Sequence, residues 1–377
     1  GNPRFDMGRN LGGRGRLNAN EERPNSNLSE PWRFEAAQFR CSNWAGVCLG
    51  PPYTLGNIQG RRTPYVFQGI FNVQRQLSDT MSAEVGYLGN SGHKLERLRA
   101  YNEAILRSGP TDARTLQQRQ PWPAYGRIQQ VDGSVNSNYH ALNLNLRQRF
   151  AKGLTYMAGY TWSKAIDTGS AIRVNSGDRL FAPNSYTLDR ERGLSQFHTG
   201  RRMVTSILYD LPFGAGKPFL NHRGVVDRVL GGWQVTSILT FADGTPINTG
   251  GIGDRASVDQ DNWPDATGIS PIPPVRTTER FWNRDAFDPN HPDLRFRNGS
   301  VGRNVLITPG TRQWDFSLLK NTRIKEGHEL EFRFEAFNFG NHPNYNAPSA
   351  DTRSATFGVI TSARTMRELQ FGLKYSF

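Results

Sequence analysis

One segment of the chain has the residue types of a phosphate-binding loop. The run GAGK at residues 214–217 matches the end of such a loop, in which backbone N–H groups and a lysine hold phosphate oxygens. Leu211, however, stands where the first glycine is required, and Pro218 stands where a Ser or Thr would bind magnesium. We therefore interpret this segment as a turn between two strands.

A second candidate segment follows residue 250. The run GGIG at residues 250–253 lacks the preceding strand and following helix of a dinucleotide-binding loop. Four nearby aspartates could surround calcium, but their spacing lacks the glycine and the final glutamate of an EF-hand loop. They are Asp254, Asp259, Asp261 and Asp265. The seven histidines include no HExxH motif. We predict that the chain is not an enzyme and that it holds no metal and no cofactor.

Apolar and polar residues alternate with a period of two in nine segments of the chain. This alternation predicts strands with one apolar face, and it leaves no apolar run near the ~18–20 residues that a membrane-spanning helix needs. A transmembrane β-barrel also keeps a low mean hydropathy, which is −0.62 here. The segments are 65–77, 81–87, 138–150, 154–163, 201–211, 233–241, 314–318, 330–335 and 368–377.

The connections between these segments alternate in length. Short turns at 78–80, 151–153, 212–232 and 325–329 alternate with long polar segments at 89–137, 165–200, 242–311 and 339–367. Short turns on one rim and long loops on the other are typical of outer-membrane barrels. The sequence therefore predicts an all-β fold, an antiparallel transmembrane β-barrel with long extracellular loops.

The alternation also divides the side chains between two faces. The predicted lipid face, in contact with the outer-membrane lipid, includes Leu142, Leu144, Tyr160, Ile207, Leu239, Phe332 and Phe371. The predicted lumen-facing residues are Arg75, Glu84, Arg147, Arg149, Glu331, Arg333 and Glu335. Charged pairs can form across the lumen wall, where arginines can also attract anionic solutes.

The net charge of +13, from 46 Lys plus Arg and 33 Asp plus Glu, raises the question of nucleic-acid binding. Proteins that hold single strands combine a cationic groove with stacking aromatic rings. Here the arginines and the aromatic residues are predicted on opposite faces. We therefore expect no nucleic acid as a partner.

Nine antiparallel strands do not close into a barrel, because the first and the ninth run in the same direction. An open edge in lipid would leave backbone groups without partners. Residues 32–39 could form a weak tenth strand within an irregular N-terminal segment, residues 1–63. We expect residues 64–377 to form the barrel wall, as the last nine or ten strands of a larger barrel.

The two cysteines, Cys41 and Cys48, lie close together in a Gly- and Pro-rich stretch. Their spacing would allow a disulfide within one loop, which suits an oxidising cell exterior. Two unlinked thiols are the alternative.

Several whole phrases resemble TonB-dependent outer-membrane receptors of the Oar-like type. They are residues 138–167, LPFGAGKPF (211–219), VLGGWQVTSILTFADGTP (229–246), residues 314–345 and FGVITSARTMRELQFGLKYSF (357–377). The resemblance implies a Gram-negative outer membrane and a longer parent protein. That parent would carry a signal peptide, a carboxypeptidase regulatory-like domain, a plug that contacts the TonB complex, and a 22-stranded barrel.

The end of the chain resembles the signal that the barrel assembly machinery reads. Gln370, Gly372, Tyr375 and Phe377 fit a pattern of a polar residue, a glycine and two aromatic residues. An extended strand with a free edge can be captured by strand addition, with alternate side chains in pockets. The alternative is that these aromatic residues are ordinary lipid-facing wall residues.

The resemblance favours a transporter that captures and takes up a large or scarce solute. An adhesin-like or structural surface protein is one alternative, and a small self-contained outer-membrane barrel is another. Nothing in the loops distinguishes a sugar, a siderophore or a peptide as the solute.

Overall fold

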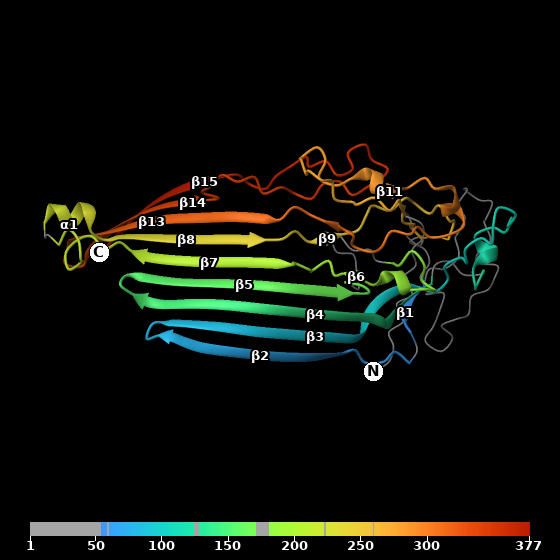
Figure 1. Cartoon of the computed structure of the whole chain (residues 1–377), viewed down its shortest axis with the longest axis horizontal. Coiled ribbons are helices and arrows are strands. Elements are labelled where there is room, and N and C mark those ends of the chain that lie inside the picture. The colour runs from blue at the N-terminus through green and yellow to red at the C-terminus, as the bar shows by residue number, and fades with distance from the viewer. Residues whose placement is uncertain (1–53, 59, 124–127, 171–180, 222–223, 259) are drawn as a thin grey trace, which may run out of the picture.

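Nine long strands lie side by side in one antiparallel sheet (Figure 1). The computed structural model describes residues 54–58, 60–123, 128–170, 181–221, 224–258 and 260–377. The all-β antiparallel prediction is confirmed. The strands are β2 (Tyr65–Ser78), β3 (Met81–Ala100), β4 (Ile128–Ala151), β5 (Leu154–Asp167), β7 (Arg201–Asp210), β8 (Trp233–Ala242), β13 (Thr311–Lys325), β14 (His328–Phe337) and β15 (Glu368–Ser376).

Strands β3 and β4 extend well into the segment 89–137, which we expected to be a polar loop. Their pairing continues to Ala100, which lies opposite Gln129. The register shifts twice in this extension, between Gly92 and Leu95 and between Leu95 and Arg97. Because these bulges interrupt the alternation, the period-two pattern did not reveal the extension.

The remaining elements are short. β1 (Thr54–Asn57) pairs in parallel with the start of β4, although we expect these residues to lie in an irregular segment. β6 (Gly193–Leu194) pairs antiparallel with the end of β5. Two small ladders join β9 (Pro246–Ile247) to β12 (Leu306–Ile307) and β10 (Asp265–Ala266) to β11 (Phe287–Asp288). The described chain also contains α1 (Val225–Leu230) and the 3-10 turns η2 (Gln117–Arg119), η3 (Asp189–Glu191), η4 (Arg284–Ala286) and η5 (Pro292–Arg295). None of the described helices is long and apolar enough to cross a membrane.

The strand register divides the sheet into two continuous faces. Val85 lies opposite Leu144, which lies opposite Tyr160, and the same face continues to Phe334 and Phe371. We call this the apolar face; all seven predicted lipid-facing residues lie on it. The other side, the polar face, carries Glu84, Arg147, Glu331, Arg333 and Glu335.

One arginine departs from the predicted division, and the face of a second is not determined. Arg75 lies opposite Ala83 and shares the apolar face with Val73. The prediction that Arg75 faces the lumen together with Glu84 was therefore wrong. Arg75 and Val73 are two residues apart on β2, and residues two apart in a strand point to the same face. Arg149 falls in the irregularity between Gln148 and Ala151, where the ladder does not fix its face.

The sheet is not closed. β2 and β15 form its two edges, and each residue of β2 is exposed. Eight antiparallel steps separate β2 from β15, so the two strands run in the same direction and cannot pair as antiparallel neighbours. The predicted strand at 32–39 and both cysteines lie outside the described residues.

The two ends of the sheet differ, as Figure 1 shows. The short turns, α1 and the C-terminus lie at one end, and the long connections gather at the other. The main apolar cluster of the described chain lies within these long connections, because the sheet is a single layer. Its buried members are Trp282, Ala286, Phe287, Val301, Leu306 and Phe357.

Candidate functional site

The long connections fold together into what we call the long-loop assembly. It comprises the described residues 101–123, 168–170, 181–200, 243–310 and 338–367. Trp282 and Phe357 pack with ring centroids 6.0 Å apart, and Phe287 meets Phe357 at 5.6 Å. The indole of Trp282 also donates a 3.0 Å hydrogen bond to the carbonyl of Ile307. This packing joins the β8–β13 connection to the β14–β15 connection.

Two buried ion pairs fasten the assembly to the strand ends. Arg303 donates to Asp167 at 2.5 Å, and the exposed fractions of these side chains are 2% and 6%. Arg97 donates to Glu191 at 2.7 Å, with exposed fractions of 4% and 5%. Charges are buried at low cost only when they are paired and hydrogen-bonded. Arg303 meets this condition with further bonds to Ser170 Oγ and to the Asp167 carbonyl.

A third contact holds the β5–β7 connection against the β3–β4 connection. The Tyr186 hydroxyl donates to the backbone carbonyl of Glu103, and the Glu103 carboxylate accepts from the N–H of Ser185 at 2.8 Å. Burial, and then the nearby Glu103 carboxylate, raises the pKa of Tyr186 to about 12. The hydroxyl therefore stays protonated and keeps donating across the ordinary pH range.

A hollow of about 290 Å³ lies between three of these connections. Leu106, Asn184, Arg190 and Trp263 contribute to its wall, together with Arg297. Asp265 holds the Arg297 side chain in place, because its carboxylate accepts two hydrogen bonds from the Arg297 guanidinium, at 2.8 and 2.6 Å. The Arg297 hydrogen bonds are the main reason that the pKa of Asp265 lies below its usual range. The hollow thus has both apolar and charged side chains in its wall, and an ion pair holds one of the charged side chains in place.

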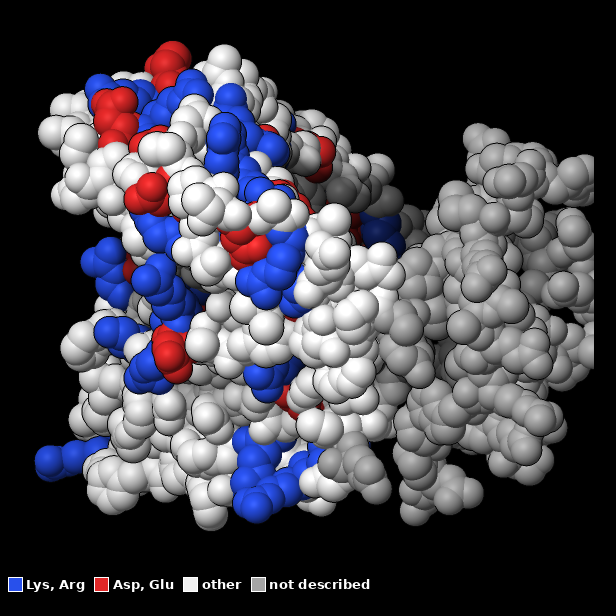
Figure 2. All heavy atoms as spheres, turned by 90° about the vertical axis from the view of Figure 1, so that its right-hand side faces the viewer, with Lys and Arg blue, Asp and Glu red and all other residues white. Residues whose placement is uncertain are grey.

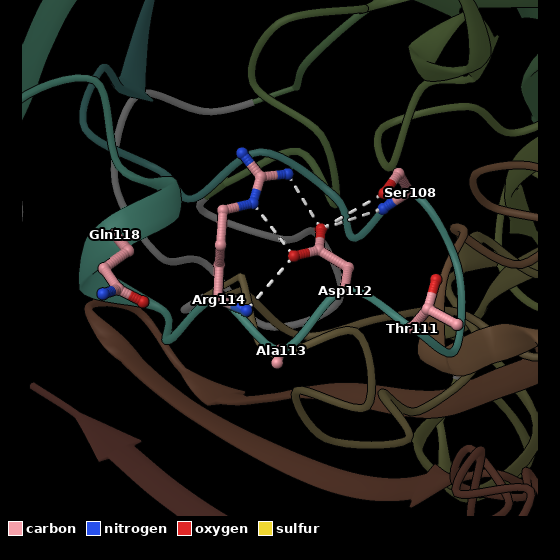
Figure 3. Close-up of a pocket in the computed structure, with 6 residues that line it drawn as sticks. All are labelled: Ser108, Thr111, Asp112, Ala113, Arg114 and Gln118. Atoms are coloured by element: carbon pink, nitrogen blue, oxygen red, sulfur yellow. Dashed lines mark hydrogen bonds and ion pairs between the residues drawn. The ribbon is translucent and has the colours of Figure 1, made fainter.

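A second hollow lies at the tip of the β3–β4 connection (Figure 3). Ser108 and Arg114 turn toward Asp112, whose carboxylate accepts from the Arg114 guanidinium at 2.9 and 2.8 Å and from the Ser108 N–H at 3.1 Å. The Arg114 hydrogen bond holds the pKa of Asp112 well below its usual range. These charges stabilise the loop's own fold.

Figure 2 shows the long-loop end of the molecule from outside. Basic and acidic side chains lie interspersed over the part that the structure describes, with uncharged surface between them. Many of the basic groups seen in the sequence are therefore close to acidic groups at this end.

The described aspartates that we considered as calcium ligands each accept hydrogen bonds from a different part of the chain. Asp254 accepts from the N–H of Val258 at 2.7 Å, Asp261 accepts from the N–H of Gly253 at 2.7 Å, and Asp265 binds Arg297. Asp259 lies outside the described residues. Among the described residues, no three His, Cys, Asp or Glu side chains come together in a metal-binding group.

The predicted polar-face residues come together mainly on β14. Arg333 donates to Glu331 at 2.7 Å, and Glu331 lies opposite Lys374 of β15. Arg147 lies far along the sheet, where its guanidinium approaches the sulfur of Met157 at 3.8 Å.

The four residues of the predicted assembly signal lie on or just after β15. Gln370 and Gly372 lie opposite Glu335 and Arg333 on the polar face, whereas Tyr375 lies opposite Leu330 on the apolar face. Phe377 is 92% exposed, and its ring stacks on that of Tyr375 at 5.9 Å. The pattern therefore presents different side chains on each face of an edge strand.

The ion pairs of the long-loop assembly were not found by sequence analysis. Arg303 is 136 residues from Asp167, and Arg97 is 94 residues from Glu191. Neither pair lies at a helical or strand spacing that a local pattern could reveal.

The chain matches a family model described as outer membrane beta barrel domain over residues 4–370. No curated protein matches the sequence. Among solved structures, the outer membrane transporter YddB from Escherichia coli is similar over 87% of this chain and 34% of its own, with 11% identity and a TM-score of 0.47.

Two further structures are similar at a lower level. The FrpB iron transporter from Neisseria meningitidis (F3-3 variant) has 11% identity and a TM-score of 0.39 over 86% of this chain and 33% of its own. FpvA of P. aeruginosa, bound to heterologous pyoverdines, has 12% identity and a TM-score of 0.36 over 83% of this chain and 27% of its own. The chain thus spans a third or less of the length of these last two structures.

The family assignment rests on the family model, which covers nearly the whole chain, and it agrees with the alternating faces and the lengths of the connections. The chain belongs to the outer-membrane β-barrel domain family, and its location is the outer membrane of a Gram-negative bacterium.

Proposed function

We propose that this chain is part of the barrel of a TonB-dependent receptor of the Oar-like type, which captures and takes up a large or scarce solute. The plug, the TonB-contacting segment and the carboxypeptidase regulatory-like domain would belong to the rest of the parent protein. The barrel assembly machinery would insert it into the membrane. We propose no catalytic role for the chain.

The long-loop assembly is the observation that carries this proposal. Its connections have an apolar cluster and two buried ion pairs, whereas three turns at the opposite end contain only two residues each. A preformed surface loses little conformational entropy when it binds, which favours capture of a dilute solute. The polar face of the sheet supplies a wall that water and a polar solute can wet.

The test is uptake by cells that carry or lack the gene for the intact protein. Three labelled probes would be compared: a ferric siderophore, an oligosaccharide and an oligopeptide. We expect uptake of one probe to depend on the gene and to stop when an uncoupler removes the proton gradient. An uptake that persists with the uncoupler would contradict energised transport.

The adhesin-like alternative predicts a different result in the same strains. Cells that lack the gene would then take up all three probes normally and lose attachment to a surface or to other cells. The long-loop assembly would serve as the contact surface in that case.

A further inference from the structure

The connection between β7 and β8 differs from the other turns at its end of the sheet. Residues 79–80, 152–153 and 326–327 form the neighbouring turns, whereas this connection occupies residues 211–232. It contains α1 and protrudes beyond the strands (Figure 1). We call its described residues, 211–221 and 224–232, the turn insert.

The turn insert has internal hydrogen bonds of its own. The Asp227 carboxylate accepts from the N–H of Ala215 at 2.6 Å, and the Asp227 carbonyl accepts from the N–H of Gly231 at 2.8 Å. The rings of Phe213 and Phe219 lie 6.2 Å apart. The insert therefore has a defined fold rather than being a simple extension of the chain.

Two residues fasten the insert to the apolar face of the sheet. Trp233 and Lys320 lie opposite each other on this face. The indole of Trp233 donates to the carbonyl of Val229 at 3.0 Å, and the Lys320 ammonium donates to the carbonyl of Gly231. The insert is thus attached on the side of the wall that carries the apolar residues.

The insert exposes its apolar side chains instead of burying them. Val225 is 73% exposed, Phe219 is 59% exposed and Val229 is 57% exposed, and Leu220, Val226 and Leu230 are exposed as well. Lys217 and Arg228 supply positive charge beside these residues. Contiguous exposed apolar residues bordered by cations are typical of segments that lie in a membrane interface.

We propose that the turn insert lies in the headgroup region of the periplasmic leaflet of the outer membrane. Short turns of such barrels face the periplasm, so this end of the wall meets that leaflet. The apolar side chains would contact phospholipid acyl chains, and Lys217 and Arg228 would lie at the level of the phosphates. The apolar face continues directly into this surface, so lipid that covers the wall also covers the insert. The inference does not depend on which solute the barrel transports.

The chain offers a matched pair of positions for the test. Val225 and Val275 are the same residue type and each is 73% exposed, but Val275 lies in the long-loop assembly. Each would be changed to Cys and labelled with a nitrobenzoxadiazole fluorophore, with the native cysteines replaced by Ser. The intact protein would be purified from outer membranes and reconstituted in phosphatidylethanolamine–phosphatidylglycerol vesicles. Heat-modifiable mobility on a gel would confirm that each labelled protein is folded.

We expect brominated phospholipid to quench the label at position 225 and iodide to have little access to it. The label at position 275 should show the opposite behaviour. Equal access of iodide to both labels would overturn the proposal. Protection from iodide without quenching by brominated lipid would also overturn it, since it would show that protein covers the insert.

Discussion

Arg303 and Asp167 show how single residues stabilise the long-loop assembly. Both side chains are almost completely buried, and the pair joins the end of β5 to the β8–β13 connection. Removing one partner would leave the other charge buried without compensation. Such changes typically destabilise by ~3–5 kcal/mol, whereas exposed pairs contribute only ~0–1 kcal/mol.

We therefore expect Arg303→Met to loosen the long loops far more than Arg353→Met. Arg353 also pairs with an aspartate in the assembly, at 3.1 Å from Asp351, but the exposed fractions of these side chains are 47% and 40%. Limited proteolysis of the folded protein in detergent would compare the two variants. Equal cleavage rates would show that the buried pair contributes no more than the exposed one.

His198 provides a pH-dependent contact at the same end of the sheet. Its Nδ1 accepts from the N–H of Ala165 at 3.3 Å, and burial, followed by the charge of Lys164, lowers the pKa of His198 below its ordinary value of 6.5. Because the folded-state pKa is lowered, the neutral ring contributes stability above pH ~6.5, and this contribution is lost as the pH falls.

We expect hydrogen exchange of the amides around residues 195–200 to accelerate as the pH falls below 6.5, after correction for intrinsic rates. His198→Gln should remove most of this dependence, because glutamine does not titrate. A variant that keeps the full dependence would assign it to another group.

At the scale of elements, β15 is an edge strand, and two aromatic residues, Tyr375 and Phe377, lie at its C-terminal end. Replacing Tyr375 and Phe377 by Ser loses about 1.5–3 kcal/mol of burial for each side chain in lipid, which a large barrel tolerates. The same change removes side chains that an assembly receptor would hold during strand addition. We expect low abundance of the intact protein in outer membranes, with normal β content after refolding in micelles.

Gly372 gives a second test of the predicted assembly signal. A Cβ at this position would lie 3.7 Å from the Cβ of Arg333, an ordinary contact, so Gly372→Ala should fold without strain. Reduced membrane abundance of this variant would support recognition of the glycine itself. Normal abundance of both the Gly372→Ala and the Tyr375→Ser/Phe377→Ser proteins would mean that these are only wall residues.

The elements also show what a sequence pattern can and cannot predict. Strict alternation identified β5, β15 and residues 138–150 of β4, because each of these has one apolar face that a single period describes. The extension of β3 to Ala100 was missed, since bulges shift the register there. The contact between Arg97 and Glu191 was also missed, because tertiary folding alone brings together residues 94 positions apart.

At the scale of the whole molecule, the two faces must meet different solvents if the sheet is part of a membrane barrel. Hydrocarbon would cover the apolar face, and water would fill the space at the polar face. Leu144 and Asn145 are neighbours on β4 that point to opposite faces, since Leu144 lies opposite Val85 and Asn145 lies opposite Glu84. They allow the orientation of the wall to be tested on one strand.

We expect Leu144→Arg to destabilise the intact protein in lipid vesicles and Asn145→Arg to be tolerated. An arginine on the lipid side costs ~2–4 kcal/mol near the bilayer midplane, because its charge loses water. An arginine at position 145 stays in the aqueous lumen, and it lies opposite the Glu84 carboxylate. Urea unfolding in vesicles, followed by heat-modifiable gel mobility, would measure both effects. The reverse order of stability would show that the polar face contacts lipid, and the assignment of inside and outside would then be exchanged.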